Sequence, residues 1–252
     1  MINNEKVGVG IVTCNRKESF YALCTKILSL DYIDYVVVCK NKDINYGDFC
    51  PSTIINNKFI YINVLDDLGV GHCKNKCLIK LLELNCDHLF IIEDDVEIID
   101  EIVFEKYVMT AKHFKLGHLN WNTLPNLQNN TTYTINADGY SLAISSRLCG
   151  CFSYFSRNAL MFCGLFDEFH YINALEHVEH TYRLSLMNFT TPFYAFAGVT
   201  NSELWLTNIG ENGQSTINYG TDIYNKRLQN ASNYFNFVYK HTLSTIRRPT
   251  FD

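Results

Sequence analysis

Four short apolar runs, separated by longer stretches of helical periodicity, constrain the fold of this sequence most strongly. The runs cover residues 7–13, 35–39, 59–65 and 88–92 and are rich in valine and isoleucine. Each is too short for a helix and has no alternating polar face, as expected for strands that are buried on both sides. The stretches between them, such as residues 17–30, repeat apolar residues at helical spacing. This alternation predicts an α/β fold with a mostly parallel central sheet and helices on both faces.

The second half of the sequence loses this alternation. Residues 116–139 are polar and rich in asparagine, which predicts a long loop over one end of the sheet. Turn-forming and polar residues at 201–219 predict a mobile segment. The other elements expected here are strands at 140–145, 151–155 and 191–199, and helices at 174–187 and 225–241. No repeat or linker is visible, so residues 1–252 are expected to form a single domain.

Composition argues against several classes of protein. The net charge of −5 and the 47% hydrophobic content of the 252 residues are not those of a disordered chain. A pI near 5.9 argues against a nucleic-acid partner. The sequence has no apolar run of about 18 residues and no signal-peptide pattern at its N-terminus, so a cytoplasmic location is expected. The 10 cysteines contain no Cys-x-x-Cys motif, which favours reduced thiols.

The acidic triplet Glu93-Asp94-Asp95 directly follows the fourth apolar run. Three adjacent carboxylates repel one another unless a cation or hydrogen-bond donors neutralise them, and divalent cations such as Mg²⁺ bind carboxylate oxygens. The alternative is that these acids cap a following turn or helix, where negative charge interacts favourably with the N-terminal end of the helix dipole. Because ligands of parallel sheets bind beyond the carboxyl ends of the strands, Thr13-Cys14-Asn15-Arg16 after the first run is a second candidate.

A glycine-rich helix start provides a third motif, Gly69-x-Gly71-x-x-Lys74-Asn75. Glycines there allow backbone N–H groups to approach a phosphate, and a lysine in the first turn adds positive charge. An ordinary strand–turn–helix junction is the alternative. The helical pattern predicts that Leu78, Leu81 and Leu82 are buried and that Lys74, Lys76 and Lys80 are solvated.

The fourth motif is Glu176-His177-Val178-Glu179-His180-x-x-Arg183, within a predicted helix. Helical spacing places Glu176, Glu179 and Arg183 on one polar face, opposite an apolar stripe of Leu175, Val178, Tyr182 and Leu186. A solvated face with a Glu179–Arg183 pair is one interpretation. A carboxylate or imidazole that acts as a general base is the other.

Taken in order, these motifs resemble family-2 glycosyltransferases of the GT-A fold. The matching stretches are Ile11 to Arg16, Gly69 to Asn75, Phe90 to Asp95, Phe155-Ser156-Arg157-x-Ala159-Leu160, Gly164-x-Phe166-Asp167-Glu168 and Glu176 to Glu179. The resemblance covers residues 7 to about 187. It implies a nucleotide-sugar-binding half at 1–115, an acceptor-side half at 116–200 and an unmatched C-terminal segment at 201–252.

The resemblance implies metal-dependent transfer of a hexose or N-acetylhexosamine from a nucleotide sugar, most often a UDP-sugar, to a hydroxyl of a glycan or glycolipid. Surface or capsular polysaccharide synthesis is the expected setting. The implied nucleotide-sugar-binding residues are Thr13, Asn15, Arg16, Asp43, Lys74, Asn75 and Asp94. The other implied roles are metal binding (Mn²⁺ or Mg²⁺) by Asp95 and His241, contact with the donor sugar or acceptor by Asp167 and Glu168, and catalysis by His177, Glu176 or Glu179. His177 stands where inverting members carry their base aspartate, so inversion is expected while retention stays open.

Two other functions are compatible with parts of the sequence. A sugar-nucleotide nucleotidyltransferase would carry a glycine- and lysine-rich signature after the first strand, and Cys14-Asn15-Arg16-Lys17-Glu18 does not match it. A degenerate GT-A binding module without transfer activity stays open because of His177. Lys240, Arg247 and Arg248 would allow a weak peripheral contact with anionic lipid at the inner face of the membrane.

Overall fold

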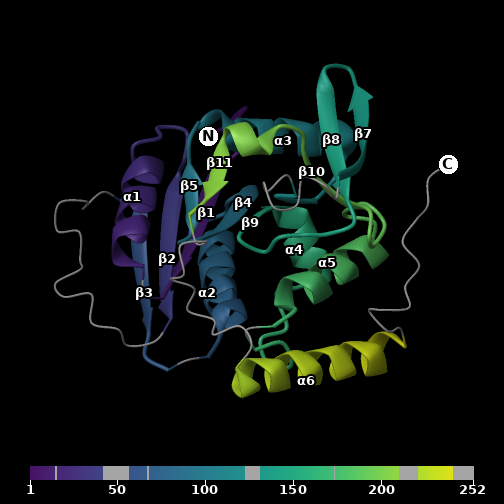
Figure 1. Ribbon diagram of the computed structural model, residues 1–252. Coiled ribbons are helices and arrows are strands. Elements are labelled where there is room, and N and C mark those ends of the chain that lie inside the picture. The colour runs from purple at the N-terminus through teal and green to yellow at the C-terminus, as the bar shows by residue number, and fades with distance from the viewer. Residues whose placement is uncertain are drawn as a thin grey trace.

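The computed structural model describes residues 1–14, 16–41, 57–66, 68–122, 131–172, 174–209 and 221–240. Its main sheet has six strands in the order β3-β2-β1-β4-β9-β6 (Figure 1). These are β3 (Phe59–Val64), β2 (Tyr35–Asn41), β1 (Val7–Thr13), β4 (His88–Glu93), β9 (Phe152–Ser156) and β6 (His118–Asn120). The first four in this order run parallel, and β9 is antiparallel to both of its neighbours. The predicted mostly parallel sheet is confirmed.

Helices cover both faces of this sheet, as predicted. Side chains alternate along each strand, so Phe90 and Ile92 of β4 enter one core and Leu89 and Ile91 enter the other. The first core is closed by α1 (Lys17–Leu28) and α3 (Ile102–Phe114). The second is closed by α2 (Val70–Glu83), α4 (Arg157–Cys163) and α5 (Glu176–Leu186). Burial on both faces explains why the parallel strands are continuous apolar runs.

Strand β1 carries glycine at alternate positions because α2 packs directly on it. A Cβ atom at Gly8 would lie 2.5 Å from Leu81 Cδ2, and one at Gly10 would lie 2.6 Å from Cys77 Cβ. Both distances are shorter than atoms tolerate, so only glycine allows this approach. The crossover helix runs back along the sheet, which brings its N-terminus to the edge where the parallel strands end.

Two smaller sheets and a last helix complete the described structure. One sheet has the antiparallel order β10 (Phe196–Val199), β8 (Tyr140–Ser145) and β7 (Thr131–Ala137), and the other pairs β11 (Leu206–Asn208) with β5 (Val96–Ile98). The short helix η2 (Ser202–Leu204) precedes β11, and α6 (Asp222–Tyr239) runs beside α5 at the bottom of Figure 1. In the part of the chain that is described, no helix has the length and apolar character needed to cross a bilayer.

Two predictions for the second half are wrong in part. The expected loop at 116–139 contains β6 and β7, and the expected mobile segment at 201–219 contains η2 and β11. Strand β6 was missed because it has only three residues and its polar His118 and Asn120 are buried against β9. The turn between β7 and β8 is Asp138-Gly139, with both residues at positive φ. This dipeptide is a strong hairpin signal, which the asparagine-rich surroundings masked.

Buried His118 predicts a loss of stability in acid. Its ring is 1% exposed, with Nδ1 2.9 Å from the Tyr154 carbonyl and Nε2 3.1 Å from Thr181 Oγ1. Burial lowers the pKa of His118 to about 4, below the value near 6.5 of an unfolded chain. The contribution of neutral His118 to the free energy of unfolding is therefore complete above about pH 6.5. As the pH falls toward 4, about 3 kcal/mol of it is lost. His118→Asn should flatten the acid limb of the stability–pH curve measured by urea unfolding. The same substitution at half-buried His113 is the control, and an unchanged limb would contradict the prediction.

Candidate functional site

The candidate site lies where β1 and β4 end side by side. The two strands are in parallel register, with Val12 opposite Glu93. This pairing brings the segment after β1 next to the acidic triplet after β4. Two motifs separated by about 80 residues in the sequence therefore form one cluster, as the prediction of a strand-end site requires.

Asp94 joins the two strand ends. Its Oδ2 accepts a hydrogen bond from Thr13 Oγ1 at 2.8 Å and another from the Cys14 backbone N–H at 3.2 Å. Its Oδ1 lies 2.5 Å from Arg16 Nη1. Burial raises the pKa of Asp94, and Arg16 and Thr13 oppose this by favouring the carboxylate. Both oxygens are thus engaged by the β1–α1 junction, which leaves Asp94 as the anchor of that junction.

Asp95 differs from Asp94 because it keeps an unpartnered oxygen. Within the described residues, its Oδ1 is buried without a hydrogen-bond partner, and its Oδ2 lies 3.7 Å from Arg16 Nη2. Burial and the neighbouring Glu93 carboxylate raise the pKa of Asp95 to about 7, with partial compensation by Arg16. A buried carboxylate beside another carboxylate suits a divalent cation, which would remove both penalties. Across the described ranges, however, no three His, Cys, Asp or Glu side chains are grouped as a complete ligand set.

Lys74 lies at the centre of a buried ionic cluster, which we call the Lys74 cluster (Lys74, Glu93, Glu176 and the Gly150 carbonyl). Its Nζ is 2.7 Å from Glu93 Oε1, 3.2 Å from Glu176 Oε1 and 3.1 Å from the Gly150 oxygen. Burial lowers the pKa of Lys74, but the two carboxylates outweigh burial and raise that pKa above its usual value. The prediction that Lys74 is solvated is wrong, since its side chain is 0% exposed. The cluster ties together α2, β4 and α5.

Asn75 and Glu168 form a second contact between α2 and the loop before α5. Asn75 Nδ2 donates to Glu168 Oε2 at 2.6 Å, and Asn75 Oδ1 accepts from the Phe166 N–H at 2.9 Å. His72 Nδ1 lies 3.0 Å from Glu168 Oε1. The neighbouring Asp167 has a different partner, since its Oδ2 lies 2.8 Å from His170 Nδ1.

The two glutamates on the polar face of α5, Glu176 and Glu179, are buried, so of the two interpretations of this motif the solvated face is wrong. Glu179 is held by Arg183 at 2.5 and 2.9 Å, and one of its oxygens also accepts from Tyr239 of α6 at 2.6 Å. Helix α6 thus contacts this face, and Leu186, which was expected on the buried apolar stripe, is exposed. The Glu179–Arg183 pair forms as predicted, but in the interior.

Glu176 and His177 begin α5 beside the Lys74 cluster. Burial raises the pKa of Glu176, but Lys74 and His177 outweigh burial and hold that pKa well below its usual range. His177 Nδ1 lies 3.3 Å from Glu176 Oε1, and its side chain is 27% exposed. A Cβ atom on Gly150 would lie 2.8 Å from the His177 ring, so glycine is needed there. Of the three candidates for a base, His177 is the one that solvent reaches.

Comparison with solved structures shows which known fold this is. No protein-family model matches the chain, and comparison with curated proteins gives no match. Among solved structures, a mannosyltransferase from Pyrobaculum calidifontis, in complex with GDP-Man and Mn²⁺, aligns over 97% of this chain with a TM-score of 0.61 and 15% identity. TarS from S. aureus aligns over 96% with a TM-score of 0.55 and 12% identity. GalNAc-T7 with UDP, GalNAc and Mn²⁺ aligns over 73% with the same score and identity.

The fold is the GT-A glycosyltransferase fold. This chain spans 66% of the mannosyltransferase, 46% of TarS and 41% of GalNAc-T7. At 12–15% identity the likeness concerns the backbone. The side chains at the strand ends are therefore the features that indicate a function for this chain.

Within this GT-A fold, the structure places Thr13, Arg16, Asp94 and Asp95 together, and Lys74, Asn75, Glu168, Glu176 and His177 nearby. Asn15, Asp43 and His241 lie outside the described residues. The sequence patterns indicated no role for His72 or Gly150, and they included Glu93 only as a member of the acidic triplet. The available signal for Gly150 was its position between two cysteines. The reason why glycine is needed there, the adjacent His177 ring, is visible only in the fold.

Proposed function

We propose that this protein is a metal-dependent glycosyltransferase that moves a sugar from a nucleotide sugar to a hydroxyl of a glycan or glycolipid. The observation that carries the proposal is the buried Oδ1 of Asp95, which has no hydrogen-bond partner among the described residues, at the strand ends of a GT-A fold. Nucleotide sugar, nucleotide and Mn²⁺ are present in structures of the mannosyltransferase and GalNAc-T7 described above. A UDP-sugar or a GDP-sugar is accordingly the expected donor class.

The residues at the strand ends would bind the donor diphosphate. Asp95 is the side chain that would hold a divalent cation, and phosphate oxygens and water would complete its coordination. When bound, such a cation supplies Lewis-acid stabilisation of the negative charge that develops on the leaving nucleotide. Thr13 and Arg16 hold Asp94 in place, and this fixes the backbone that presents Asp95.

His177 is the side chain proposed to take the proton of the acceptor hydroxyl. Glu176 Oε1 is 3.3 Å from His177 Nδ1, which favours the tautomer with the proton on Nδ1 and makes Nε2 the basic nitrogen. As the acceptor oxygen bonds to the sugar carbon and the bond to the diphosphate breaks, Nε2 takes the proton. One direct displacement of this kind inverts the sugar centre. Glu179, held by Arg183 and Tyr239, serves the packing of α5 and α6 in this proposal.

A binding and turnover experiment tests this function. We expect UDP or GDP to raise the melting temperature by several degrees in the presence of Mn²⁺ only, since a ligand at 100 times its Kd adds about 2.7 kcal/mol. With the matching nucleotide sugar and an acceptor panel, His177→Ala should lower sugar transfer about 100-fold or more while nucleotide binding is unchanged. Exposed Glu97→Ala is the control variant. Nucleotide binding without any transfer would favour the degenerate binding module, and no binding of any nucleotide would contradict both.

A further inference from the structure

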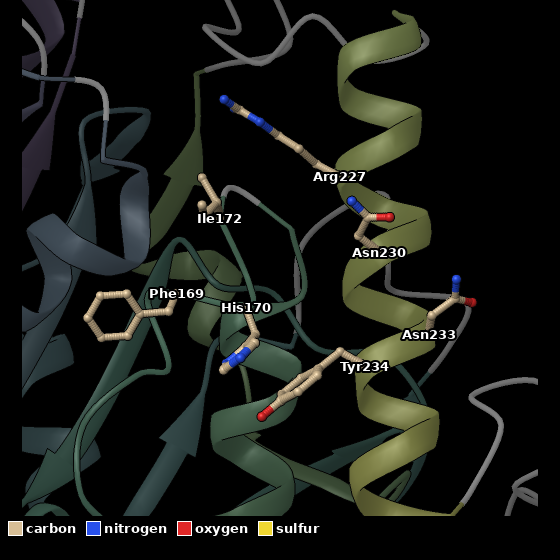
Figure 2. Close-up of a pocket in the computed structure, with 7 residues that line it drawn as sticks. All are labelled: Phe169, His170, Ile172, Arg227, Asn230, Asn233 and Tyr234. Atoms are coloured by element: carbon tan, nitrogen blue, oxygen red, sulfur yellow. The ribbon is translucent and has the colours of Figure 1, made fainter.

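A pocket of about 510 Å³ lies outside the strand-end site, between the loop before α5 and helix α6. Its volume is typical of small-molecule sites. Figure 2 shows the lining side chains, which are Phe169, His170 and Ile172 from the loop and Arg227, Asn230, Asn233 and Tyr234 from α6. Arg227 and Ile172 lie toward one end of the view, and His170 and Tyr234 toward the other.

One end of the pocket is aromatic and rigid. The rings of His170 and Tyr234 stack at 3.7 Å between centroids with a 5° angle between their planes. Asp167 holds His170 in place: Asp167 Oδ2 lies 2.8 Å from His170 Nδ1, and Asp167 Oδ1 accepts a hydrogen bond from the His170 backbone N–H. The Phe169 side chain, 79% exposed, adds a third ring to the lining of the pocket. The two rings cover one face of each other, so the C–H face of a pyranose ring would pack on an outer face of this pair.

One side of α6 forms the other wall of the pocket, and this wall is mainly polar. Arg227, Asn230 and Tyr234 follow at intervals of three and four residues, which places them on one helix face. Within the described residues, neither the Arg227 guanidinium nor the Asn230 amide has a hydrogen-bond or ion-pair partner. Amide and guanidinium groups together donate to and accept from hydroxyl groups. Aromatic rings beside such hydrogen-bonding groups form the kind of surface that binds a carbohydrate.

The pocket adjoins the strand-end site. Phe169 directly follows Glu168, which is bonded to Asn75 at the start of α2. At the other side, burial and the nearby Glu176 carboxylate raise the pKa of Tyr224 in the first turn of α6. The interval from Arg227 to Tyr234 corresponds to about 10 Å of helix, enough for about two linked sugar rings. A chain in the pocket can therefore extend toward His177.

We propose that this pocket binds a short oligosaccharide segment of the acceptor, with sugar faces on the His170–Tyr234 pair and hydroxyl groups on Asn230 and Arg227. The inference rests on the proposed glycosyltransferase function and names the acceptor class, a glycan of at least two sugars. It also assigns a role in acceptor binding to α6, which lies in the segment that the sequence resemblance left unmatched.

Saturation-transfer NMR tests the proposal with a panel of defined di- and trisaccharides of hexoses, N-acetylhexosamines and hexuronic acids. We expect at least one panel member to receive saturation at its ring C–H protons. Tyr234→Ala should abolish this signal, Tyr234→Phe should keep it, and Arg227→Ala should weaken the affinity about tenfold. The matched controls are Phe237→Ala, an exposed aromatic one turn beyond the pocket, and Lys226→Ala, the exposed cation beside Arg227. Neither control should change the affinity.

The outcomes separate this proposal from the proposed function. Loss of saccharide binding in Tyr234→Ala, with Mn²⁺-dependent nucleotide binding intact, supports the pocket as an acceptor site. Equal binding by Tyr234→Ala and Phe237→Ala overturns it, as does a protein that binds nucleotide but no member of the panel. Saccharide binding in the pocket of a protein that binds no nucleotide would overturn the acceptor role together with the transferase, and leave a carbohydrate-binding protein.

Discussion

Replacing Asp95 with alanine should lower sugar transfer at least about 1000-fold and leave the protein folded. The side chain carries the buried, unpartnered oxygen proposed to hold the divalent cation. Loss of the cation would remove several kcal/mol of charge stabilisation on the leaving nucleotide, and each 1.4 kcal/mol changes the rate about tenfold. The measurements are transfer rate at saturating donor and the calorimetric affinity for nucleotide with and without Mn²⁺. Nucleotide binding should lose its dependence on Mn²⁺.

The stability of the Asp95 variants provides an independent readout. Burial and Glu93 raise the pKa of Asp95 to about 7, above the value near 3.9 of an unfolded chain. The metal-free native protein therefore favours the protonated form and loses stability as the pH rises from about 4 to about 7. Asp95→Asn should remove that loss, whereas exposed Glu97→Gln should not. A variant that keeps Mn²⁺-dependent nucleotide binding would contradict the metal assignment.

Local patterns predicted much of the fold. The valine- and isoleucine-rich runs form β1 to β4, and the helical spacing between them forms α1 and α2, with ends that differ by a few residues. Pairing of β1 with β4 then places Thr13 and Arg16 beside Asp94 and Asp95. The strand-end cluster could be predicted because parallel sheets have one ligand-binding edge, whichever residues occupy it.

Predictions that depended on distant partners were the ones that failed. Lys74 has the local pattern of a solvated lysine, but its partner Glu176 lies 102 residues further along the chain. Glu179 reads as surface because nothing within α5 indicates that Tyr239 of α6 will cover it. Strand β6, at three residues, is stabilised by its pairing with β9 and carries little signal of its own. Periodicity reports which face of an element is apolar, and it does not report which polar groups other elements bury.

Lys74→Met should reduce the free energy of unfolding by about 3–5 kcal/mol. Methionine has similar bulk, so the change mainly removes the cation from between Glu93 and Glu176. It leaves the buried Glu176 carboxylate with His177 as its remaining partner and the half-buried Glu93 without its cation. In the native protein Lys74 keeps the pKa of Glu176 low. Without Lys74, burial should raise that pKa above its unfolded value, so the variant should be least stable at neutral pH and recover as the pH falls. Urea unfolding across this pH range measures both effects.

Two further variants decide whether the loss comes from unpaired charge or from the shape of the site. Lys76→Met, at an exposed position on the same helix, should change the stability by less than about 0.5 kcal/mol. Adding Glu176→Gln to Lys74→Met should restore part of the stability, because one buried charge is removed with its partner. If the double variant is no more stable than Lys74→Met, and the loss does not vary with pH, the Lys74 cluster contributes through packing alone. The cluster would then hold α5 against α2 by contact, and His177 would owe its position to Gly150 more than to the ion pair.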